Sequence, residues 1–350
     1  LAAIGPRVRR VVAAPKGGAL YETVRQRGLA DQILLLPRGR RFRRLLRVAG
    51  ALRLIWWVVP RRQKLLAIHA NAMTGFYLAA PAAILSRVPV VAWVHDSIST
   101  PWGRRLGPML RRLSPKVRWV AVSRTAAEVP IANRASGPDD VQIVPNPIDK
   151  SEVVGSSHRR DQDGRIRVGF LGAPTRAKGF DLLPPVIEGL SDLPIEWMLF
   201  TNRGSTDLEA PIWKKLESLT DARINELGRV SDVRRAYERC DLIFNPSRFE
   251  SFSRVTAEAM MNGLPVVGSD LPALRDLLGN NEAGLLFPPG EPKEAAEALR
   301  SLIADPALRA TLSSAGLRRG ARFEPADIAD QMLAIYEVPT LSADEEKKIW

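Results

Sequence analysis

The chain has 350 residues, of which 45% are hydrophobic, so it is long enough for two domains with separate cores. A single cysteine, Cys240, excludes a disulfide framework and a multi-cysteine metal site and favours a reducing compartment, and three widely spaced histidines show no zinc-ligand pattern. The net charge of +13 is uneven, because residues 1–150 hold 26 basic against 7 acidic side chains and residues 151–350 hold 25 against 31, so the first half is expected to face something anionic.

The first half alternates short apolar runs with longer helix-like stretches. Apolar runs of this length, bounded by polar or turn residues, favour buried strands. Strands are predicted at 8–14, 32–36, 64–69, 88–95, 117–122 and 141–144, with helices at 19–28, 42–59 and 73–86. Thr125 and Glu128 have the spacing of a capping box at a further helix start. Apolar strands that alternate with helices predict a parallel sheet covered on both faces.

A polar stretch over 149–164 resembles a linker, and the alternation restarts after it. Strands are predicted at 166–171, 195–200, 223–227, 242–245, 265–268 and 284–287, with longer helices at 292–303, 306–319 and 325–336. The fold class is therefore α/β, with two doubly wound Rossmann-like domains. We expect an N-terminal domain over 1–150, a C-terminal domain over 151–325, and a helix and tail over 326–350. No apolar run is long enough to predict a membrane span, and no signal peptide is visible.

The stretch SRFESFSRVTAEAMMNGLPVV, residues 247–267, holds two glutamates, Glu250 and Glu258, with seven residues between them. Glu250 follows a predicted strand, and Glu258 lies in the predicted helix that comes next. At about 1.5 Å rise per residue the two carboxylates are roughly 12 Å apart. That exceeds the roughly 5–9 Å of paired glycosidase carboxylates. The spacing suits two ends of an extended ligand whose phosphates meet the amides at the helix start. The alternative is a surface helix with an acidic first turn.

A second motif, VGFLGAPTRAKGFDLL, follows the predicted strand 166–171. Gly172 ends that strand and permits close backbone approach, and Lys178 lies six residues later at a predicted helix start, where its ammonium group can meet a phosphate. The Gly-Lys-Ser/Thr order of a Walker loop is absent. Taken alone, the motif is also typical of an ordinary strand-to-helix turn.

Several segments together carry a resemblance to a known family. FLGAPTRAKGFDLL, GRVSDVRRAYERCDLIFNPSRFESFSRVTAEAMMNGLPVVGSDLPALRDLL and AGLLFPPG resemble the carboxyl half of the retaining glycosyltransferases of GT-B architecture, and more narrowly the glycosyl transferases group 1 family. VVAWVHDS, VAVSRTAAE and IVPNPID resemble parts of that family's first domain. The resemblance is most specific between Val168 and Phe287. It implies two domains that face a cleft, and it favours the ligand-clamp interpretation of the two glutamates.

The resemblance implies a role for each matching position. Glu250 corresponds to the carboxylate that contacts the donor sugar near the reacting carbon. Glu258 corresponds to the carboxylate that accepts from the ribose hydroxyls, and Lys178 to the lysine that neutralises the donor diphosphate. The family does not require a bound metal, and no Asp-x-Asp metal motif is present.

The resemblance also extends to backbone contacts and to the first domain. The amides of Phe252 and Ser253 fall where the loop meets phosphate and sugar, and Val230 lies in the segment that borders the base. His95 ends a buried strand pattern and matches a histidine near the sugar and acceptor, where it would position substrate or stabilise charge. The alternative for His95 is a capping His-Asp pair at a strand end.

Two positions depart from the family's pattern. The family usually has an arginine directly after the glycine, and this chain has Ala173, so Arg176 is the candidate substitute as a phosphate contact. The beginning of the chain resembles the family's first helix end and second strand. We therefore expect the family's first strand and its Gly-Gly loop to lie outside this sequence, or Lys16-Gly17-Gly18 to be a degenerate form of that loop.

The first half also combines basic residues with tryptophan and leucine, in PRGRRFRRLLRVAGALRLIWWVVPRRQK and PWGRRLGPMLRRLSPKVR. Cations beside an apolar stripe are typical of a helix that lies at a lipid interface. An anionic membrane surface is therefore an expected partner of the N-terminal domain, and the alternative is a solvated basic face. No nucleic-acid reader motif is present, so nucleic acid is not expected as a partner.

The resemblance thus implies a retaining hexosyl-type glycosyltransferase that moves a sugar from a nucleoside-diphosphate sugar to a hydroxyl acceptor. We expect a glycan or lipid-linked acceptor in cell-envelope glycolipid or polysaccharide synthesis, and no cofactor besides the donor substrate. The expected location is the cytoplasm or the inner face of the cell membrane. The alternatives are a nucleotide-sugar 2-epimerase, which the glutamate pair disfavours, and a non-catalytic GT-B protein that binds a partner or membrane.

Overall fold

A computed structural model of the chain describes residues 8–15, 19–37, 43–95, 101–113, 117–149, 164–203, 209–219, 223–230 and 232–336. The chain separates into two compact units. One unit contains Leu1–Pro145 together with Pro325–Trp350, and the other contains Asn146–Glu324. The chain therefore crosses between the units twice.

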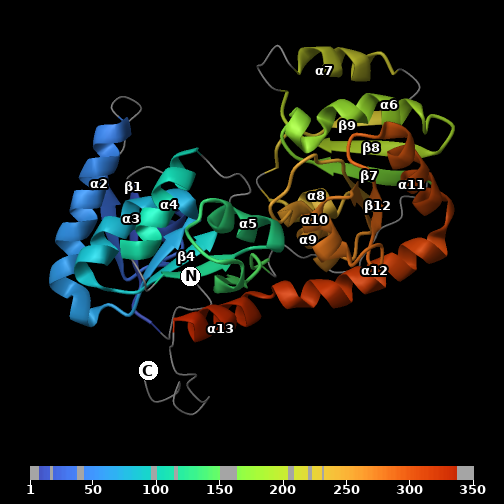
Figure 1. Ribbon diagram of the computed structural model, residues 1–350. Helices are drawn as coiled ribbons and strands as arrows, with labels where there is room; N and C mark the ends of the chain where they lie inside the picture. The colour runs from blue at the N-terminus through green and yellow to red at the C-terminus, as the bar shows by residue number, and fades with distance from the viewer. Residues whose placement is uncertain are drawn as a thin grey trace. The chain divides into compact units, whose positions relative to one another are not determined.

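The second unit is built on a six-stranded parallel sheet (Figure 1). Its strands are β7 (Ile166–Leu171), β8 (Ile195–Phe200), β9 (Arg223–Glu226), β10 (Leu242–Asn245), β11 (Val266–Ser269) and β12 (Leu285–Phe287). They lie in the order β12-β11-β10-β7-β8-β9, and each neighbouring pair is parallel. The strand order reverses between β7 and β10, and doubly wound sheets bind ligands beyond the carboxyl ends of the strands at such a reversal.

Helices cover both faces of this sheet. They are α6 (Leu183–Glu188), α7 (Ala210–Glu217), α8 (Arg234–Tyr237), α9 (Arg254–Met261), α10 (Pro272–Leu278), α11 (Pro292–Ala304) and α12 (Pro306–Gly320), with 3-10 turns η5 (Arg176–Lys178), η6 (Phe180–Leu182) and η7 (Ala321–Phe323). Helices α6, α7 and α11 form a core with Phe170, Trp197 and Phe244 of the strands. Side chains alternate along a strand, so Ile243 and Val266 face the other side, where α9 contacts β10 and β11.

The first unit contains two parallel sheets among its described residues. Its strands are β1 (Val11–Pro15), β2 (Gln32–Leu36), β3 (Ile68–Asn71), β4 (Val90–Val94), β5 (Val117–Ala121) and β6 (Val141–Ile143). β1 pairs with β2, and the others lie in the order β3-β4-β5-β6. The single sheet expected for this half is thus divided into two sheets, although Leu34, Trp57 and Ile68 pack in one cluster that joins the two parts.

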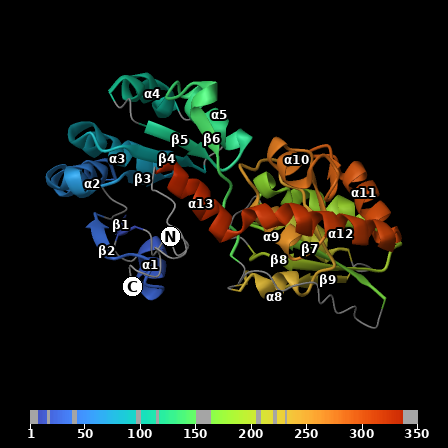
Figure 2. The same cartoon turned by 90° about the horizontal axis from the view of Figure 1, so that it is seen from below.

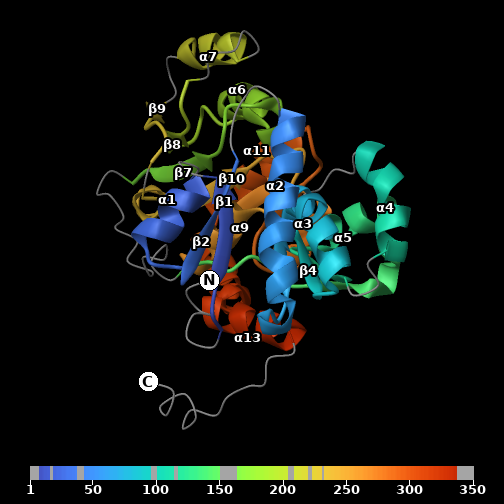
Figure 3. The ribbon, with the colours of Figure 1, turned by 90° about the vertical axis from the view of Figure 1, so that its left-hand side faces the viewer.

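The helices of the first unit follow the predicted alternation. They are α1 (Ala19–Gln26), α2 (Arg43–Val58), α3 (Ala72–Ser86), α4 (Pro101–Leu113), α5 (Arg124–Ala132) and α13 (Pro325–Ile335), with 3-10 turns η2 (Val59–Lys64) and η3 (Pro138–Asp140). Helices α2 and α3 pack side by side (Figure 3). A Cβ atom at Gly50 of α2 would lie 3.4 Å from the side chain of Leu78 of α3, an ordinary contact distance, so the two helices meet at this position.

The last helix, α13, belongs to the first unit although it follows the second unit in sequence (Figure 2). Its residues Ile328, Met332 and Ile335 form a buried cluster with Val91 and Val120 of β4 and β5. Burying each such side chain contributes about 1.5–3 kcal/mol. The C-terminal helix is therefore part of the first unit's core.

The capping box predicted for Thr125 and Glu128 is wrong. Helix α5 begins at Arg124, and Ser123 caps it by accepting a hydrogen bond from the amide of Ala126 at 3.1 Å. Ser123 has the extended backbone that lets an N-cap side chain reach an amide three residues on. Thr125 lies inside the first turn, and its buried hydroxyl has no hydrogen-bond partner among the described residues.

Candidate functional site

Lys178 and Glu250 meet at the point where the strand order of the second unit reverses. Lys178 ends η5 after β7, and Glu250 follows β10, the strand that neighbours β7. The Lys178 Nζ atom lies 2.7 Å from the Glu250 Oε1 atom. The Glu250 side chain is 11% exposed and that of Lys178 is 39% exposed, so the pair is partly shielded yet open to a ligand. Parallel strands end at one edge of the sheet, which brings these distant residues together.

The loop between β10 and α9 is fixed by a buried amide that sequence reasoning missed. Asn245, the last residue of β10, donates to Ser253 Oγ at 2.9 Å and to Thr256 Oγ1 at 3.0 Å. The Ser247 hydroxyl lies 2.8 Å from Asn245 Oδ1 and 2.9 Å from Glu250 Oε1. Asn245 therefore ties the start of the loop, the end of the loop and the glutamate into one network. Its position at the carboxyl end of an apolar strand was a usable signal.

Ser253 holds a strained backbone at the start of α9. Its φ is +69°, in the left-handed region that non-glycine residues seldom adopt. Such a conformation costs about 1–3 kcal/mol and is often found at functional sites. The side chain of the neighbouring Phe252 is buried against Phe323, with ring centroids 5.6 Å apart. The ring of Phe252 thus faces the interior, which leaves only its backbone for the predicted ligand contact.

Glu258 is buried and has its own partners. Tyr237 donates a hydrogen bond from its hydroxyl to Glu258 Oε2 at 2.7 Å, and Arg254 Nη2 lies 2.8 Å from Glu258 Oε1. Burial, followed by the negative charge of Glu258, raises the pKa of Tyr237 well above its usual value. The phenol therefore stays protonated and acts as a donor. Tyr237 is a second site residue that sequence reasoning missed.

The turn after β7 packs closely on the loop after β10. Gly179 has φ +69°, and a Cβ atom there would lie 1.9 Å from the carbonyl oxygen of Pro246, so only glycine fits. Arg248 reinforces this contact, because it forms a bidentate pair with Asp181 at 2.6 and 2.9 Å and donates to the Arg176 carbonyl at 3.0 Å. Neither Gly179 nor Arg248 was predicted as a site residue.

Gly172 and Arg176 belong to the same turn after β7, and neighbouring protein atoms restrict these two residues less than they restrict Gly179. A Cβ atom at Gly172 would be 3.6 Å from the ring of Phe170, an ordinary contact distance, so the described protein atoms do not themselves require glycine there. The side chain of Arg176 is exposed, and no ion-pair partner of its guanidinium is found in the described part of the chain. Ala173 is also exposed. The arrangement leaves the Arg176 side chain accessible to a ligand.

Val230 follows β9, the edge strand of the sheet, and is half-buried. The segment before it turns at Gly228, with φ +67°, and is held by a hydrogen bond from the Arg229 amide to Asn202 Oδ1 at 2.7 Å. β9 lies two strands away from β7 in the sheet. Val230 thus follows the carboxyl end of β9, at the same end of the sheet as Lys178.

His95 lies in the first unit, directly after β4, and is half-buried. Its ring centroid is 5.1 Å from that of Trp93, and Trp93 in turn makes an edge contact with His69 at 5.7 Å. Nδ1 of His69 is hydrogen-bonded to the Tyr336 hydroxyl. The protein groups around the ring desolvate it although part of the residue stays exposed, and together with the nearby His95 they lower the pKa of His69 to about 4, so this imidazole is neutral near pH 7. Asp96, expected beside His95, lies outside the described residues.

Within the described ranges, no group of three or more histidine, cysteine, aspartate or glutamate side chains could hold a metal ion. The described polar residues of the second unit instead provide a cation, two separate carboxylates and a strained helix start at one sheet edge. This set can bind an extended ligand that has an anionic centre and hydroxyl groups on both sides.

Two family models match successive parts of the chain. The Glycosyltransferase Family 4 model matches residues 1–152, and the Glycosyl transferases group 1 model matches residues 165–305. A D-inositol 3-phosphate glycosyltransferase from Corynebacterium urealyticum is 30% identical over 190 residues, which cover 50% of this chain and 43% of that protein. A phosphatidyl-myo-inositol mannosyltransferase from Mycobacterium tuberculosis is 28% identical over 291 residues, which cover 77% of this chain and 73% of that protein.

The match spans about half the length of several curated relatives, for example 43% of the Corynebacterium protein and 56% of a D-inositol 3-phosphate glycosyltransferase 1 from Catenulispora acidiphila. Among solved structures, HepE from Anabaena in complex with UDP has a TM-score of 0.76 at 21% identity and covers 95% of this chain and 93% of its own. A glycosyltransferase from Rickettsia africae has a TM-score of 0.80 at 13% identity and covers 96% and 93%. At these identities the likeness concerns the fold.

Proposed function

We propose that this chain, which has the GT-B fold of two Rossmann-like domains and whose halves match two glycosyltransferase family models, is a retaining glycosyltransferase. It would move a sugar from a nucleoside-diphosphate sugar to a hydroxyl acceptor. The observation that carries the proposal is the position of Lys178 and Glu250, 2.7 Å apart at the strand-order reversal of the second unit. A donor diphosphate placed there meets a cation, and its sugar meets a carboxylate.

Each predicted site residue then has a task at the donor. Lys178 and Arg176 neutralise the diphosphate, and Gly172 lets it approach the backbone. Glu250 accepts hydrogen bonds from the sugar, and Glu258, held by Tyr237 and Arg254, accepts from the ribose hydroxyls. The amides of Phe252 and Ser253 meet phosphate and sugar, and Val230 borders the base. His95, in the first domain, would act on the acceptor side.

Donor binding would move Lys178 from its ion pair with Glu250 to the donor diphosphate. Lys178 is paired with Glu250 in the protein alone, and a diphosphate offers it more negative charge than one carboxylate does. Departure of the nucleoside diphosphate would leave negative charge on the phosphate oxygens, which Lys178 and the loop amides stabilise from fixed positions. Such preorganised donors are commonly the largest source of rate enhancement in group transfer. Glu250 would then orient the sugar rather than remove a proton.

The proposed setting is cell-envelope glycolipid or polysaccharide synthesis with a glycan or lipid-linked acceptor. Relatives named for phosphatidyl-myo-inositol and for lipopolysaccharide core mannosyl transfer support this setting, the latter being 26% identical over 274 residues. We place the enzyme in the cytoplasm, because a single cysteine favours a reducing compartment. No cofactor besides the donor is proposed.

The first experiment is a calorimetric screen of UDP, GDP, ADP and their sugars against the full chain. We expect one nucleotide to bind, Glu258→Ala to abolish binding, and Lys178→Ala to weaken it by roughly tenfold or more, because charge-assisted hydrogen bonds contribute about 1.5–3 kcal/mol. Glu282→Ala is the matched control, since this exposed glutamate pairs with Arg319 away from the cluster. Transfer by the wild type and none by Glu250→Ala would then establish catalysis, and NMR of the product would give the anomeric configuration.

The non-catalytic alternative rests on Ala173, where a guanidinium contact to the diphosphate is absent. A folded chain that binds none of the nucleotides would refute the donor site and favour this alternative. A nucleotide-sugar 2-epimerase would convert the donor without any acceptor, which the same product analysis detects.

A further inference from the structure

Helix α2 of the first unit presents an apolar face to solvent. Leu45, Val48, Leu52 and Trp56 are separated by three, four and four positions, so they lie on one side of the helix. Their side chains are 66%, 58%, 60% and 73% exposed. In a globular protein the apolar stripe of a surface helix normally faces the core. This one, called the α2 stripe below, faces away from it.

The opposite side of α2 already makes the helix's packing contacts. Trp57 and Val58 are buried with Ala82 of α3 and Leu34 of β2. Gly50 packs against Leu78 of α3. The helix is therefore attached to the unit without the stripe, and the stripe adds nothing to the described core. Contiguous exposed apolar residues of this kind mark an interaction surface.

The stripe is accompanied by positive charge only. Residues 43–64, which span α2 and η2, contain seven Lys and Arg residues and no Asp or Glu. Arg47 and Arg53 are exposed, and no described acidic residue forms an ion pair with either. The whole stretch 1–150 has 26 basic against 7 acidic residues. The surface is thus matched to an apolar partner with negative charge.

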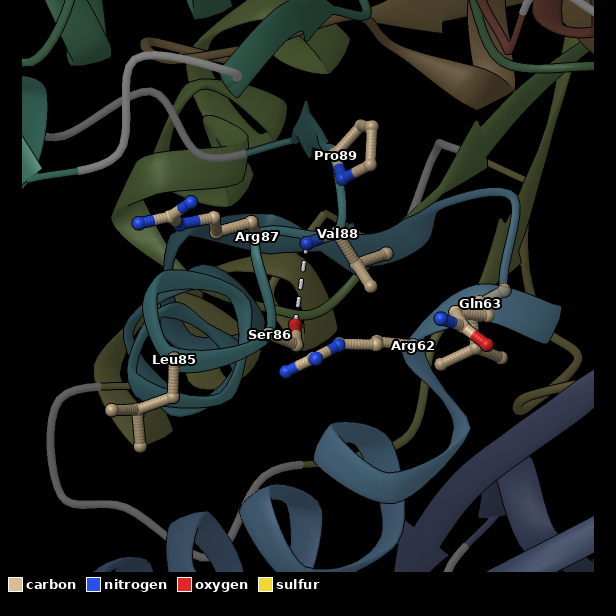
Figure 4. A pocket seen from close by; sticks show the side chains of 8 residues that line it. Arg62, Gln63, Leu85, Ser86, Arg87, Val88 and Pro89 are labelled. Carbon is tan, nitrogen blue, oxygen red and sulfur yellow. Dashed lines mark hydrogen bonds between the residues drawn. The ribbon is translucent and has the colours of Figure 1, made fainter.

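The same combination continues at the end of the helix, around a pocket of about 550 Å³ (Figure 4). Arg62 of η2 and Arg87 after α3 lie on either side of Ser86, which is fixed by a hydrogen bond from the Val88 amide at 3.3 Å. Leu85, in the same lining, is 58% exposed. Two guanidinium groups beside an exposed leucine repeat the pattern of α2.

We propose that α2 and η2 form a surface that docks the chain on an anionic lipid bilayer. The α2 stripe enters the boundary between headgroups and acyl chains, and the arginines of α2, η2 and the pocket contact lipid phosphates. The exposed apolar residues of α2 lie on one side of the helix, so the helix would lie along the membrane surface. An anionic bilayer supplies an apolar layer that can cover the α2 stripe, and negative charge that can pair with the arginines beside it. The inference is independent of sugar transfer, because it uses no residue of the proposed donor site.

Vesicle binding of the full chain tests the proposal. We expect binding to phosphatidylglycerol-containing vesicles and little binding to pure phosphatidylcholine. Leu52→Gln with Trp56→Gln should weaken binding at least tenfold, and each of Arg53→Gln and Arg62→Gln by roughly fivefold at low salt. Leu317→Gln, on α12 of the second unit and 40% exposed, is the matched control and should bind like the wild type. Unchanged thermal unfolding of each variant shows that the fold is retained.

The fluorescence of Trp56 reports how deeply the α2 stripe enters the bilayer. Brominated lipids should quench tryptophan fluorescence in the wild type, and Trp56→Leu, which keeps the stripe apolar, should bind normally with less quenching. Equal binding to neutral and anionic vesicles, or full binding by the Leu52/Trp56 double variant, would overturn the proposal. So would a dimer in lipid-free solution that the same double variant dissociates, because the stripe would then be covered by a second copy of the chain.

Discussion

At the scale of single residues, the candidate site separates into two polar clusters with different partners. Glu250 is paired with Lys178 and contacts Ser247, whereas Glu258 is held between Tyr237 and Arg254. A buried carboxylate needs such partners, because an uncompensated buried charge destabilises a protein by several kcal/mol. The two glutamates therefore have distinct local environments, as a clamp for two ends of one ligand requires.

Tyr237→Phe tests whether the phenol positions Glu258. The variant removes one hydrogen bond to a buried carboxylate, which contributes about 1.5–3 kcal/mol. We expect nucleotide binding to weaken roughly tenfold and the free energy of unfolding to fall, with both measured by calorimetry on the same samples. Tyr336→Phe is the matched control, because it removes a tyrosine hydrogen bond in the first unit and should leave nucleotide affinity unchanged. Wild-type affinity in Tyr237→Phe would contradict a positioning role.

At the scale of elements, two loops make the site rigid. The turn after β7 and the loop after β10 touch at Gly179, where a side chain has no room, and Arg248 bonds across the contact. Asn245 then fixes the loop to the start of α9. This network holds the strained backbone of Ser253 in place. The site is therefore built on strand ends and a helix start, supported by buried hydrogen bonds.

His69, the second residue of β3, gives the first unit a pH-dependent stability. The pKa of His69 is about 4 in the folded protein and near 6.5 when unfolded. Between these values the unfolded chain binds a proton that the folded chain does not, so stability falls as the pH is lowered from 6.5 towards 4. We expect chemical unfolding of the first unit to show this slope and His69→Gln to reduce it. His158→Gln, a histidine expected from the sequence to be solvated, should keep the wild-type slope.

At the scale of the whole molecule, the chain leaves its first unit and returns to it. The crossing segments are joined inside the second unit, where the Ile148 amide donates to the Phe323 carbonyl at 2.8 Å. Phe323 also contacts Phe252, and Arg254 donates to the Pro147 carbonyl at 3.3 Å. Residues of the candidate site thus contact both crossing segments.

Deletion of residues 325–350 tests the return of the chain. Without α13, Val91 and Val120 lose the cover of Ile328 and Met332, so we expect the first unit to be strongly destabilised. The second unit keeps its own core and should remain folded. Hydrogen exchange should become fast in β4 and β5 and stay slow in β7 and β10. Protection of all four strands in the truncated chain would show that α13 is dispensable.

The sequence by itself determined the local elements of this protein. All the strands and helices predicted with bounds, except 8–14 and 64–69, coincide with observed elements or differ from them by at most two residues at either end, as 166–171 and 195–200 do with β7 and β8. This works because apolar periodicity and turn residues act over a few positions. The fold class of two Rossmann-like domains followed from that alternation and is confirmed. The roles given to Glu250, Glu258, Lys178 and the other site residues stay predictions.

Only the tertiary structure decided which distant residues meet. The pairing of Lys178 with Glu250 depends on β7 and β10 being neighbours, which strand order sets and local pattern does not. Tyr237 and Arg248 were missed because a polar residue in a helix or a loop has no distinctive local signal, whereas Asn245 had a usable one at the end of an apolar strand. The packing of α13 on the first unit and the outward direction of the α2 stripe also depend on contacts between residues far apart in the sequence. Long-range packing selects one arrangement among many that the same local elements allow.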